Sequence, residues 1–177
     1  MKIYKTAIPE VKILKPTAHG DERGFFMETF RQSWLPDFNF VQDNHSRSAK
    51  GTLRGLHYQL NKPQGKLVRV IEGSVFDVAV DIRRSSQFFG KYVCQKLTAE
   101  NKEMFWIPPG FAHGFLVTSE AAQFVYKCTS YYSPEDERSI RWDDPEISIA
   151  WPSLTETPLL SVKDQIAPNL ISAEVYD

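Results

Sequence analysis

Several features that direct a protein to the cell exterior, to membranes or to nucleic acids are scarce in this sequence. Its 177 residues include only two cysteines, Cys94 and Cys128. Both lie in strand-like runs, where we expect them to be reduced and packed. No segment approaches the roughly 18 consecutive apolar residues that would span a bilayer. The formal net charge is −1 and no run of five like charges occurs, so there is no electrostatic case for nucleic acid or an anionic membrane as a partner. We therefore expect a cytoplasmic protein.

Helical signals are also few. Aromatic residues make up 13% of the chain, and eleven prolines and nine glycines punctuate it, a composition that favours strands and turns. Strands are predicted in residues 3–15 with a break at Pro9, and in 67–72, 75–83, 92–100, 104–108, 115–119 and 122–132. Short helices are expected only at 31–36 and near 159–165, and turns at 142–146 and 151–158. This pattern predicts an all-β sandwich or barrel, with residues 1–177 as a single domain.

A single histidine lies among cations in the run GTLRGLHYQLNKPQGK, residues 51–66. Arg54 lies three positions before His57, and Lys66 nine positions after it. Because side chains alternate along a strand, Arg54 would point away from His57 unless Gly55 marks a β-bulge. A lone histidine is more often a hydrogen-bonded core residue than a base. An arginine and a lysine this close to it instead indicate a site that receives an anion.

The predicted strand at residues 75–83 has two different faces. One face is wholly apolar, whereas the other carries small residues and two carboxylates, Asp77 and Asp81. That alternation is expected of a strand that lines both a core and a cavity. Asp81 lies near the end of the strand, and we expect it to face water.

The spacing PxGxxH at Pro108, Gly110 and His113 resembles the second motif of cupins, which are double-stranded β-helix or jelly-roll proteins. Metal-binding cupins carry HxH in an earlier motif, but the corresponding place here reads HYQ, with His57 alone. A first-row metal site generally needs three or four protein ligands. We therefore expect no metal and no other cofactor, which leaves His57 free for proton transfer.

A more specific resemblance covers nearly the whole chain, in order. It is carried by the segments GDERGFFMETF (20–30), FVQDNHSRS (40–48), LRGLHYQ (53–59), QGKLVRV (64–70), VFDVAVDIR (75–83), LTAEN (97–101), WIPPGFAHGF (106–115), YKCTSYYSPEDE (126–137) and SVKDQIAP (161–168). Together they resemble the dTDP-4-dehydrorhamnose 3,5-epimerases. The resemblance implies a metal-free, cupin-type jelly roll with a few short helices that forms a homodimer. It also implies inversion of C3 and C5 of dTDP-4-dehydro-6-deoxyglucose, which gives the L-rhamnose precursor used for cell-surface polysaccharide.

The implied reaction gives chemical roles to a small set of residues. Removing a proton next to the C4 carbonyl creates an enolate, which needs a base on one face, a cation or donor at the oxygen, and an acid opposite. The resemblance assigns His57 as the base and Asp164 as the carboxylate that orients it. Tyr126 is then the acid, and Lys66, held by Asp77, stabilises the enolate oxygen. Without the resemblance, Tyr126 is interpreted as a tyrosine that lines the barrel.

Further residues match substrate contacts of the family. Fixed cations near a diphosphate replace its lost hydration, and a flat ring suits stacking on thymine. The cations are Arg23, Arg54 and Lys163, the stacking ring is Tyr132, and the remaining contacts are Glu28, Gln42, Asp43, Asn44, His113 and Glu137. Glu137 lies in the run PEDER, whose neighbouring carboxylates can exchange roles with it.

Three alternatives share parts of this pattern. A relative of the same fold that epimerises only C3 needs the same base and acid, so the motifs separate the two poorly. A metal-dependent cupin oxygenase or isomerase is disfavoured by the missing HxH. A non-enzymatic sugar-binding jelly roll would keep the aromatic rings and cations, but it has no use for a base opposed to an acid.

Overall fold

The computed structural model describes residues 1–153 and 157–177. The strands are β1 (Lys2–Lys5), β2 (Lys12–Lys15), β3 (Ala18–Asp21), β4 (Gly24–Met27), β5 (Gln42–Ala49), β6 (Leu53–Gln59), β7 (Lys66–Glu72), β8 (Ser74–Asp81), β9 (Tyr92–Thr98), β10 (Met104–Ile107), β11 (Phe111–Val117), β12 (Ala121–Cys128) and β13 (Glu137–Ser139). The helices are η1 (Gln32–Trp34), η2 (Pro134–Asp136), α1 (Val162–Gln165) and η3 (Leu170–Ser172).

These elements confirm most of the local predictions. The break at Pro9 separates β1 from β2, which pair as an antiparallel hairpin. The short helices predicted at 31–36 and near 159–165 correspond to η1 and α1, and a turn occupies residues 142–146. Of the second predicted turn, residues 154–156 lie outside the described residues.

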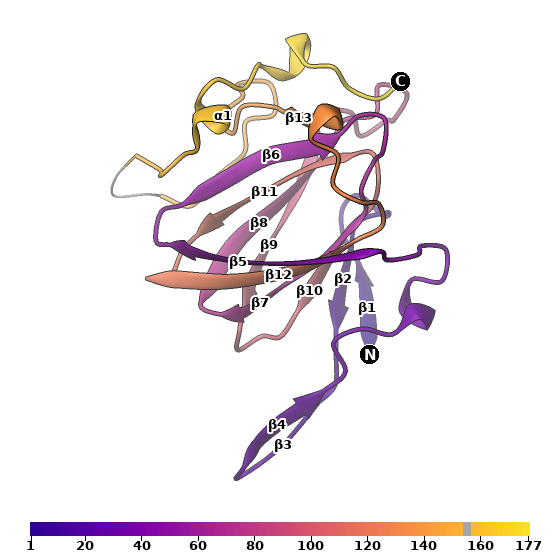
Figure 1. Cartoon of the computed structure of the whole chain (residues 1–177), viewed down its shortest axis with the longest axis vertical. Coiled ribbons are helices and arrows are strands. Elements are labelled where there is room, and N and C mark those ends of the chain that lie inside the picture. The colour runs from indigo at the N-terminus through magenta and orange to yellow at the C-terminus, as the bar shows by residue number, and fades with distance from the viewer. Residues whose placement is uncertain (154–156) are drawn as a thin grey trace.

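Two antiparallel sheets face each other and form the body of the molecule (Figure 1). One sheet has the order β1-β2-β10-β7-β12-β5, and the other has the order β13-β6-β11-β8-β9. Two packed antiparallel sheets are the arrangement of a jelly roll, so the predicted all-β fold is confirmed. Side chains alternate along each strand, and each sheet therefore presents one face to its partner sheet and one face outward.

Buried apolar side chains cover both faces of the sheets. Phe105 and Phe124 belong to the core between the sheets. Ile82 lies in a second cluster on the outer face of the five-stranded sheet, together with Leu170 from the C-terminal segment. Trp106 belongs to a third cluster, on the outer face of the six-stranded sheet. Packing on both faces fixes the strands from which the site is built.

Strand β8 shows how the two faces differ. Phe76, Val78 and Val80 pack in the outer cluster, whereas Val75 and Ala79 face the core between the sheets. Asp77 is fully buried on this inner face. The expectation that Asp81 faces water is wrong, because Asp81 is also fully buried. Arg83 and Ser86 donate hydrogen bonds to its carboxylate and replace the lost solvation.

The predicted bulge at Gly55 is confirmed. In the pairing of β6 with β11, His57 lies opposite His113, but Arg54 lies opposite Phe115, so β6 has one extra residue. Gly55 has a φ of +131°, and a Cβ built on it would lie 2.5 Å from the Cα of Gly114. Only glycine fits this backbone position.

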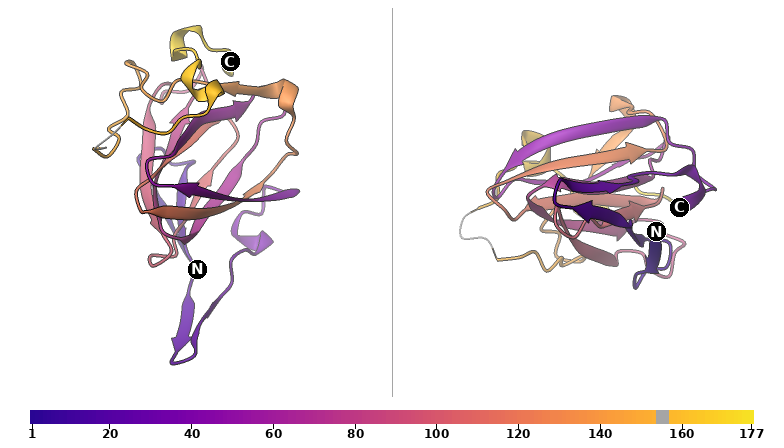
Figure 2. Two further views of the ribbon diagram at one scale, coloured as in Figure 1. Left: turned by 60° about the vertical axis from the view of Figure 1, so that its left-hand side comes forward. Right: turned by 90° about the horizontal axis from the view of Figure 1, so that it is seen from below.

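A hairpin of β3 and β4 projects from the body of the molecule (Figure 2). Arg23 lies in its turn with 86% of its side chain exposed, and Phe25 and Phe26 are also exposed. We call residues 18–27 the arm. Because it projects, its side chains lie outside the space between the two sheets of its own chain.

Both cysteines are free. Cys128 is fully buried, as predicted, whereas Cys94 is exposed, so its predicted packing is wrong. Among the described residues, no helix has the length and apolar character needed to cross a membrane.

Candidate active site

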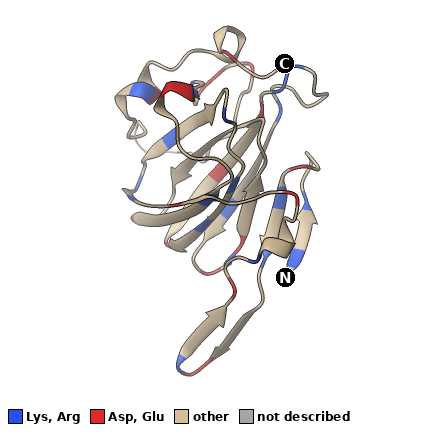
Figure 3. Cartoon of the chain, turned by 45° about the vertical axis from the view of Figure 1, so that its right-hand side comes forward, with Lys and Arg blue, Asp and Glu red and all other residues tan. Residues whose placement is uncertain are grey.

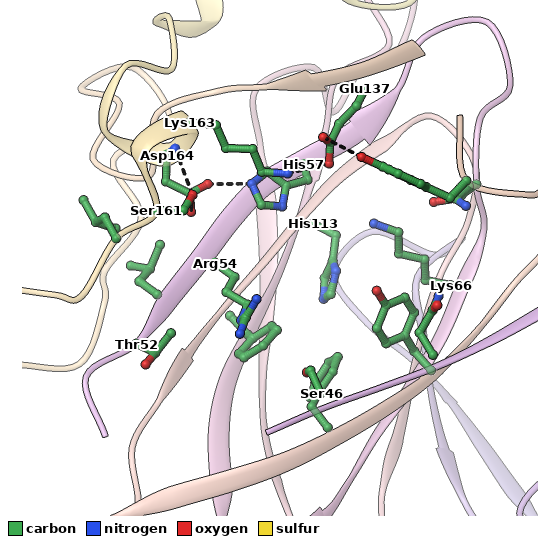
Figure 4. Close-up of a pocket in the computed structure, with 18 of the residues that line it drawn as sticks. Ser46, Thr52, Arg54, His57, Lys66, His113, Glu137, Ser161, Lys163 and Asp164 are labelled. Carbon is green, nitrogen blue, oxygen red and sulfur yellow. Dashed lines mark hydrogen bonds and ion pairs between the residues drawn. The ribbon is translucent and has the colours of Figure 1, made fainter. Parts of the chain in front are cut away.

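A cavity of about 620 Å³ lies between the two sheets, below the segment that carries α1 (Figure 4). Arg54 and His57 reach it from β6, and the bulge at Gly55 is what turns both side chains toward the same face. His113 enters from β11 and Lys66 from β7, and further polar groups come from β5, β12, β13, α1 and the connecting segments. One end of the space is therefore lined with cations and hydrogen-bonding groups.

The imidazole of His57 is paired with a carboxylate from the far end of the chain. Its Nε2 donates to Asp164 Oδ1 at 2.5 Å. The other oxygen of that carboxylate, Oδ2, accepts a hydrogen bond of 2.6 Å from Ser161 Oγ. Asp164 is 2% exposed, so both of its oxygens are held by protein donors in a nearly dry setting. In this arrangement Nε2 of His57 carries the hydrogen that it donates to Asp164. Nδ1 is therefore the nitrogen that can accept a proton.

Burial lowers the pKa of His57 below its ordinary value, although Asp164 opposes that shift. Burial alone would raise the pKa of Asp164, but hydrogen bonds from His57, Ser161 and the backbone of Gly55 hold it below its ordinary value. Near neutral pH the pair is therefore a carboxylate beside a neutral imidazole. A neutral imidazole with a fixed carboxylate behind it is suited to act as a general base.

A second histidine and carboxylate pair lies deeper. His113 Nε2 donates to Asp77 Oδ1 at 2.9 Å, and both side chains are buried. The predicted partnership of Asp77 with Lys66 is wrong as a direct contact, because the carboxylate of Asp77 is bound by His113 instead. Burial lowers the pKa of Lys66, and the nearby Asp77 opposes the shift at longer range. The amino group of Lys66 thus enters the cavity with little solvent around it.

Tyr126 lines the same cavity from β12, which belongs to the sheet opposite that of His57. Burial raises the pKa of its phenol above the ordinary value of 10.0, although Arg54 opposes the shift. The phenol is therefore protonated at neutral pH and can donate a proton. Below it, the rings of Phe115 and Phe124 stack with centroids 4.3 Å apart and give the cavity an apolar floor.

Polar groups form a chain across the mouth of the cavity. Lys163 donates to Glu137 Oε1 at 2.6 Å, and the hydroxyl of Tyr132 donates to Glu137 Oε2 at 3.1 Å. Gln42 accepts from the backbone of Tyr132 and donates to Asn44. These contacts hold the half-exposed ring of Tyr132 at the entrance, where a flat ligand group can stack on it.

Eleven of the predicted site residues line this one cavity. They are Gln42, Asn44, Arg54, His57, Lys66, His113, Tyr126, Tyr132, Glu137, Lys163 and Asp164.

Three predicted substrate contacts lie elsewhere in this chain. Arg23 is in the arm, where it is paired with Asp21, and Glu28 follows β4 and is paired with Arg31. Asp43 lies on β5 between two cavity residues, so alternation turns its side chain to the outer face of the sheet. There it accepts from Lys127.

The sequence reasoning did not identify several residues that line the cavity, namely Ser46, Thr52, Leu53, Gln64, Phe115, Phe124, Leu159, Leu160 and Ser161. For Ser161 a signal was present, since the run SVKD has the S-x-x-D spacing of a helix N-cap. Ser161 is the N-cap of α1 and accepts from the backbone nitrogen of Asp164. Leu159 and Leu160 come from a segment that pairs with Thr52 through a single β-bridge. A single bridge produces no periodic pattern in the sequence, so it could not be predicted.

Charged residues of both signs are spread over the molecule. Figure 3 shows acidic and basic residues interspersed over the ribbon, with an adjacent basic and acidic residue in α1. Within residues 1–153 and 157–177, no group of three or more His, Cys, Asp or Glu side chains is placed to hold a metal ion. The cavity places the imidazole of His57 and the phenol of Tyr126 on opposite sheets, with Arg54 and Lys66 in the same space. Groups of these kinds can move a carbon-bound proton beside a carbonyl group.

Comparison with known proteins gives one consistent result. A family model described as dTDP-4-dehydrorhamnose 3,5-epimerase matches residues 5–172. A relative of that name from Pseudomonas aeruginosa is 52% identical and is covered over 99% of both chains. One from Neisseria gonorrhoeae is 56% identical over 98% of this chain. The chain spans 54% of the length of the Neisseria relative.

Solved structures agree in fold. The dTDP-6-deoxy-D-glucose-3,5-epimerase RmlC of Legionella pneumophila, in complex with dTDP-4-keto-L-rhamnose, superposes with a TM-score of 0.93 at 55% identity, covering 97% of this chain and 93% of that one. ChmJ, a 3'-monoepimerase from Streptomyces bikiniensis in complex with dTDP-quinovose, has a TM-score of 0.89 at 35% identity, covering 96% and 88% of the two chains.

Proposed function

This chain belongs to the dTDP-4-dehydrorhamnose 3,5-epimerase family, and from that membership we propose how it performs the reaction of the family. It is an isomerase that converts dTDP-4-dehydro-6-deoxy-D-glucose to dTDP-4-dehydro-L-rhamnose by inverting C3 and C5, a step of dTDP-L-rhamnose biosynthesis. The observation that best supports the mechanism is that His57 and Tyr126 reach one cavity from opposite sheets.

Proton removal falls to His57. Its Nδ1 takes the proton from the carbon next to the C4 carbonyl, and Asp164 stabilises the imidazolium that forms. The electron pair left on carbon moves into the carbonyl group and gives an enolate. Lys66 holds the enolate oxygen. A preorganised donor of this kind in a dry site contributes on the order of 3–4 kcal/mol to the lowering of the barrier.

Reprotonation from the other face inverts the carbon centre. Tyr126 donates its proton to the face of the sugar ring opposite His57, and the enolate collapses back to the ketone. Exchange with solvent then removes the proton from the imidazolium of His57 and returns one to the phenolate of Tyr126, so that the same base and acid can act at the second carbon that flanks C4.

The mouth of the cavity suits the nucleotide end of the substrate. Tyr132 stacks on thymine, and Arg54 and Lys163 face the diphosphate. Glu137, Gln42 and Asn44 supply the remaining contacts with the substrate. Hydrogen bonds to neighbouring side chains already hold these three groups in position.

One experiment tests the reaction, the substrate and the positions together. We expect purified protein in D₂O to exchange both H3 and H5 of dTDP-4-dehydro-6-deoxy-D-glucose for deuterium and to yield dTDP-4-dehydro-L-rhamnose, as followed by proton NMR. Deuterium at C3 alone would show the C3-only epimerase, the activity that the name of ChmJ describes. No exchange at either carbon would contradict the proposed function altogether.

The pKa shifts predict the pH dependence of kcat/KM. His57 acts as a neutral base, and its pKa lies below 6.5, so we expect the acidic limb of the profile to fall at a pH below 6.5. Tyr126 acts as a protonated acid, and its pKa lies above 10.0, so loss of its proton affects activity only in strongly alkaline solution. Initial rates between pH 5 and 10 would check this expectation. An acidic limb above pH 7 would contradict the assignment of His57 as a buried neutral base.

We further propose that the enzyme is a homodimer in which each arm reaches the cavity of the partner. Arg23 in the arm and Glu28 just after it match substrate contacts of the family, yet neither lines the cavity of its own chain, and the arm projects from the body of the molecule (Figure 2). A second copy related by two-fold symmetry can bring both residues to the site. We also propose that the enzyme is cytoplasmic, because both of its cysteines are free thiols, the state that a reducing compartment maintains.

Subunit mixing tests the exchanged arm. Arg23→Ala and His57→Ala should each be weakly active alone. When the two are unfolded together and refolded as a mixture, hybrid dimers contain one cavity with both native residues, so activity should recover to roughly one quarter of the wild-type value. Each variant refolded alone is the control. Absence of recovery, with hybrid dimers demonstrated by mass spectrometry, would contradict arm exchange.

A further inference from the structure

The hydroxyl group of Ser161 is hydrogen-bonded to Asp164, the carboxylate that orients the proposed base His57. Ser161 Oγ donates to Asp164 Oδ2 at 2.6 Å, and it accepts from the backbone nitrogen of Asp164 at 3.3 Å. Figure 4 shows Ser161, Asp164 and His57 in one hydrogen-bonded line that ends in the cavity. The helix that presents this carboxylate is a single turn, so the backbone alone constrains it weakly.

We infer that Ser161 is a positioning residue of the proposed epimerase, which fixes Asp164 behind His57 during proton abstraction. This inference rests on the proposed function for its catalytic consequence, but the contact itself is a property of the free enzyme. A carboxylate with one bonded oxygen can rotate about its terminal torsion. With Oδ2 held by Ser161, Oδ1 stays directed at Nε2 of His57, and Nδ1 stays directed into the cavity.

The contact between Ser161 and Asp164 matters for the base because Asp164 is buried. Asp164 is 2% exposed, so water does not readily replace the hydroxyl group. Without the hydroxyl group the carboxylate of Asp164 can turn about its terminal torsion, which loosens its contact with the imidazole of His57. The pKa of His57 is already lowered by burial and is supported by Asp164, so a looser Asp164 would lower it further. We therefore expect a weaker and less well oriented base.

Other charged and titratable groups surround His57 and must be kept constant in the test. They are Lys163 and Asp164 from α1, Glu137 from β13, Lys66 from β7, His113 from β11 and Arg54 from its own strand.

The chain contains an internal control for the motif. Ser133 is the N-cap of η2, and its hydroxyl donates to Asp136 Oδ2 at 2.8 Å. The spacing S-x-x-D is the same as in Ser161 and Asp164. Ser133 and Asp136, however, are not among the residues that line the cavity. A change at Ser133 therefore removes the same kind of local contact without touching His57.

Glycine separates capping from hydrogen-bond donation. Glycine is nearly as good an N-cap as serine, and its effect on helix stability is only a few tenths of a kcal/mol, but it has no hydroxyl group. Ser161→Gly thus removes the donor to Asp164 while α1 persists. Ser161→Thr restores a hydroxyl group at the same position and tests for rescue.

The experiment measures the pKa of His57 by ¹⁵N NMR in the substrate-free protein, and kcat with KM at several pH values. For Ser161→Gly we expect a lower pKa of His57, an acidic limb displaced to lower pH, and a kcat reduced roughly 5- to 30-fold with KM nearly unchanged. Ser161→Thr should restore both readouts, and Ser133→Ala should change neither, although its thermal unfolding temperature should fall.

Several outcomes would overturn the inference. One is a Ser161→Gly protein whose His57 pKa and kcat match the wild type. Another is a Ser133→Ala protein that shifts both readouts equally, or a Ser161→Thr protein as impaired as the glycine variant. If the wild type fails to epimerise, the proposed function fails, but the NMR measurement still decides whether Ser161 controls the state of His57.

Discussion

Replacing His57 with alanine should lower turnover by roughly 10²–10⁴-fold, the usual contribution of one general base. The variant keeps the stacking ring and the cations at the mouth, so we expect dTDP binding measured by calorimetry to persist. It also leaves Asp164 as a buried carboxylate without its imidazole partner, and thermal stability should fall because a buried anion loses a hydrogen bond. Binding and turnover thus separate in this variant.

A matched histidine change tests specificity. His45 lies on β5 with its side chain exposed on the outer face of the sheet, where it contacts Gln123. His45→Ala should turn over at nearly the wild-type rate. Unchanged turnover in His57→Ala would remove His57 from the mechanism, and equal losses in both variants would indicate a general structural effect instead.

Tyr126→Phe should lower the rate of inversion by a similar factor, roughly 10²–10⁴-fold, but with a different isotopic pattern. His57 remains able to remove the substrate proton and to return a solvent-derived one to the same face. We therefore expect deuterium from D₂O to enter the substrate with its configuration retained, while little epimerised product forms. NMR of recovered substrate measures the exchange, and analysis of the product measures the inversion.

Tyr176→Phe is a suitable control for Tyr126→Phe. Tyr176 also has a partly buried phenol, whose hydroxyl donates to the backbone carbonyl of Gln59, but it packs on the outer face of the five-stranded sheet. We expect lower stability and a normal rate for this variant. If exchange and inversion decline together in Tyr126→Phe, then Tyr126 is not the acid that protonates the opposite face.

The fold could be predicted from local patterns, because alternation and turn residues act over a few neighbouring positions. The two faces of β8 and the bulge at Gly55 followed from such rules, and the structure confirms them. The error at Asp81 has a physical reason. A position near a strand end favours exposure, but Arg83 and Ser86 fold back over this carboxylate and bury it, and this contact depends on the conformation of the following loop.

The site was less accessible to sequence reasoning because its contacts join distant elements. The partner of Asp77 could not be predicted from the sequence, since Lys66 and His113 both enter the same buried space and only the folded arrangement brings His113 to the carboxylate. Likewise, Asp43 lies between two cavity residues in sequence, and strand alternation turns its side chain away. The pairing of His57 with Asp164 spans 107 positions, and the resemblance alone suggested it.

That separation has a consequence for synthesis on the ribosome. The last strand of the sandwich, β13, ends at Ser139, whereas the carboxylate behind the base arrives with α1. Because a nascent chain emerges from its N-terminus, the sheets can assemble while His57 still lacks its partner Asp164. A truncated translation product that ends between these points would carry His57 without the carboxylate that orients it and without the cavity wall formed by Leu159, Leu160 and Ser161, so it would remain chemically silent.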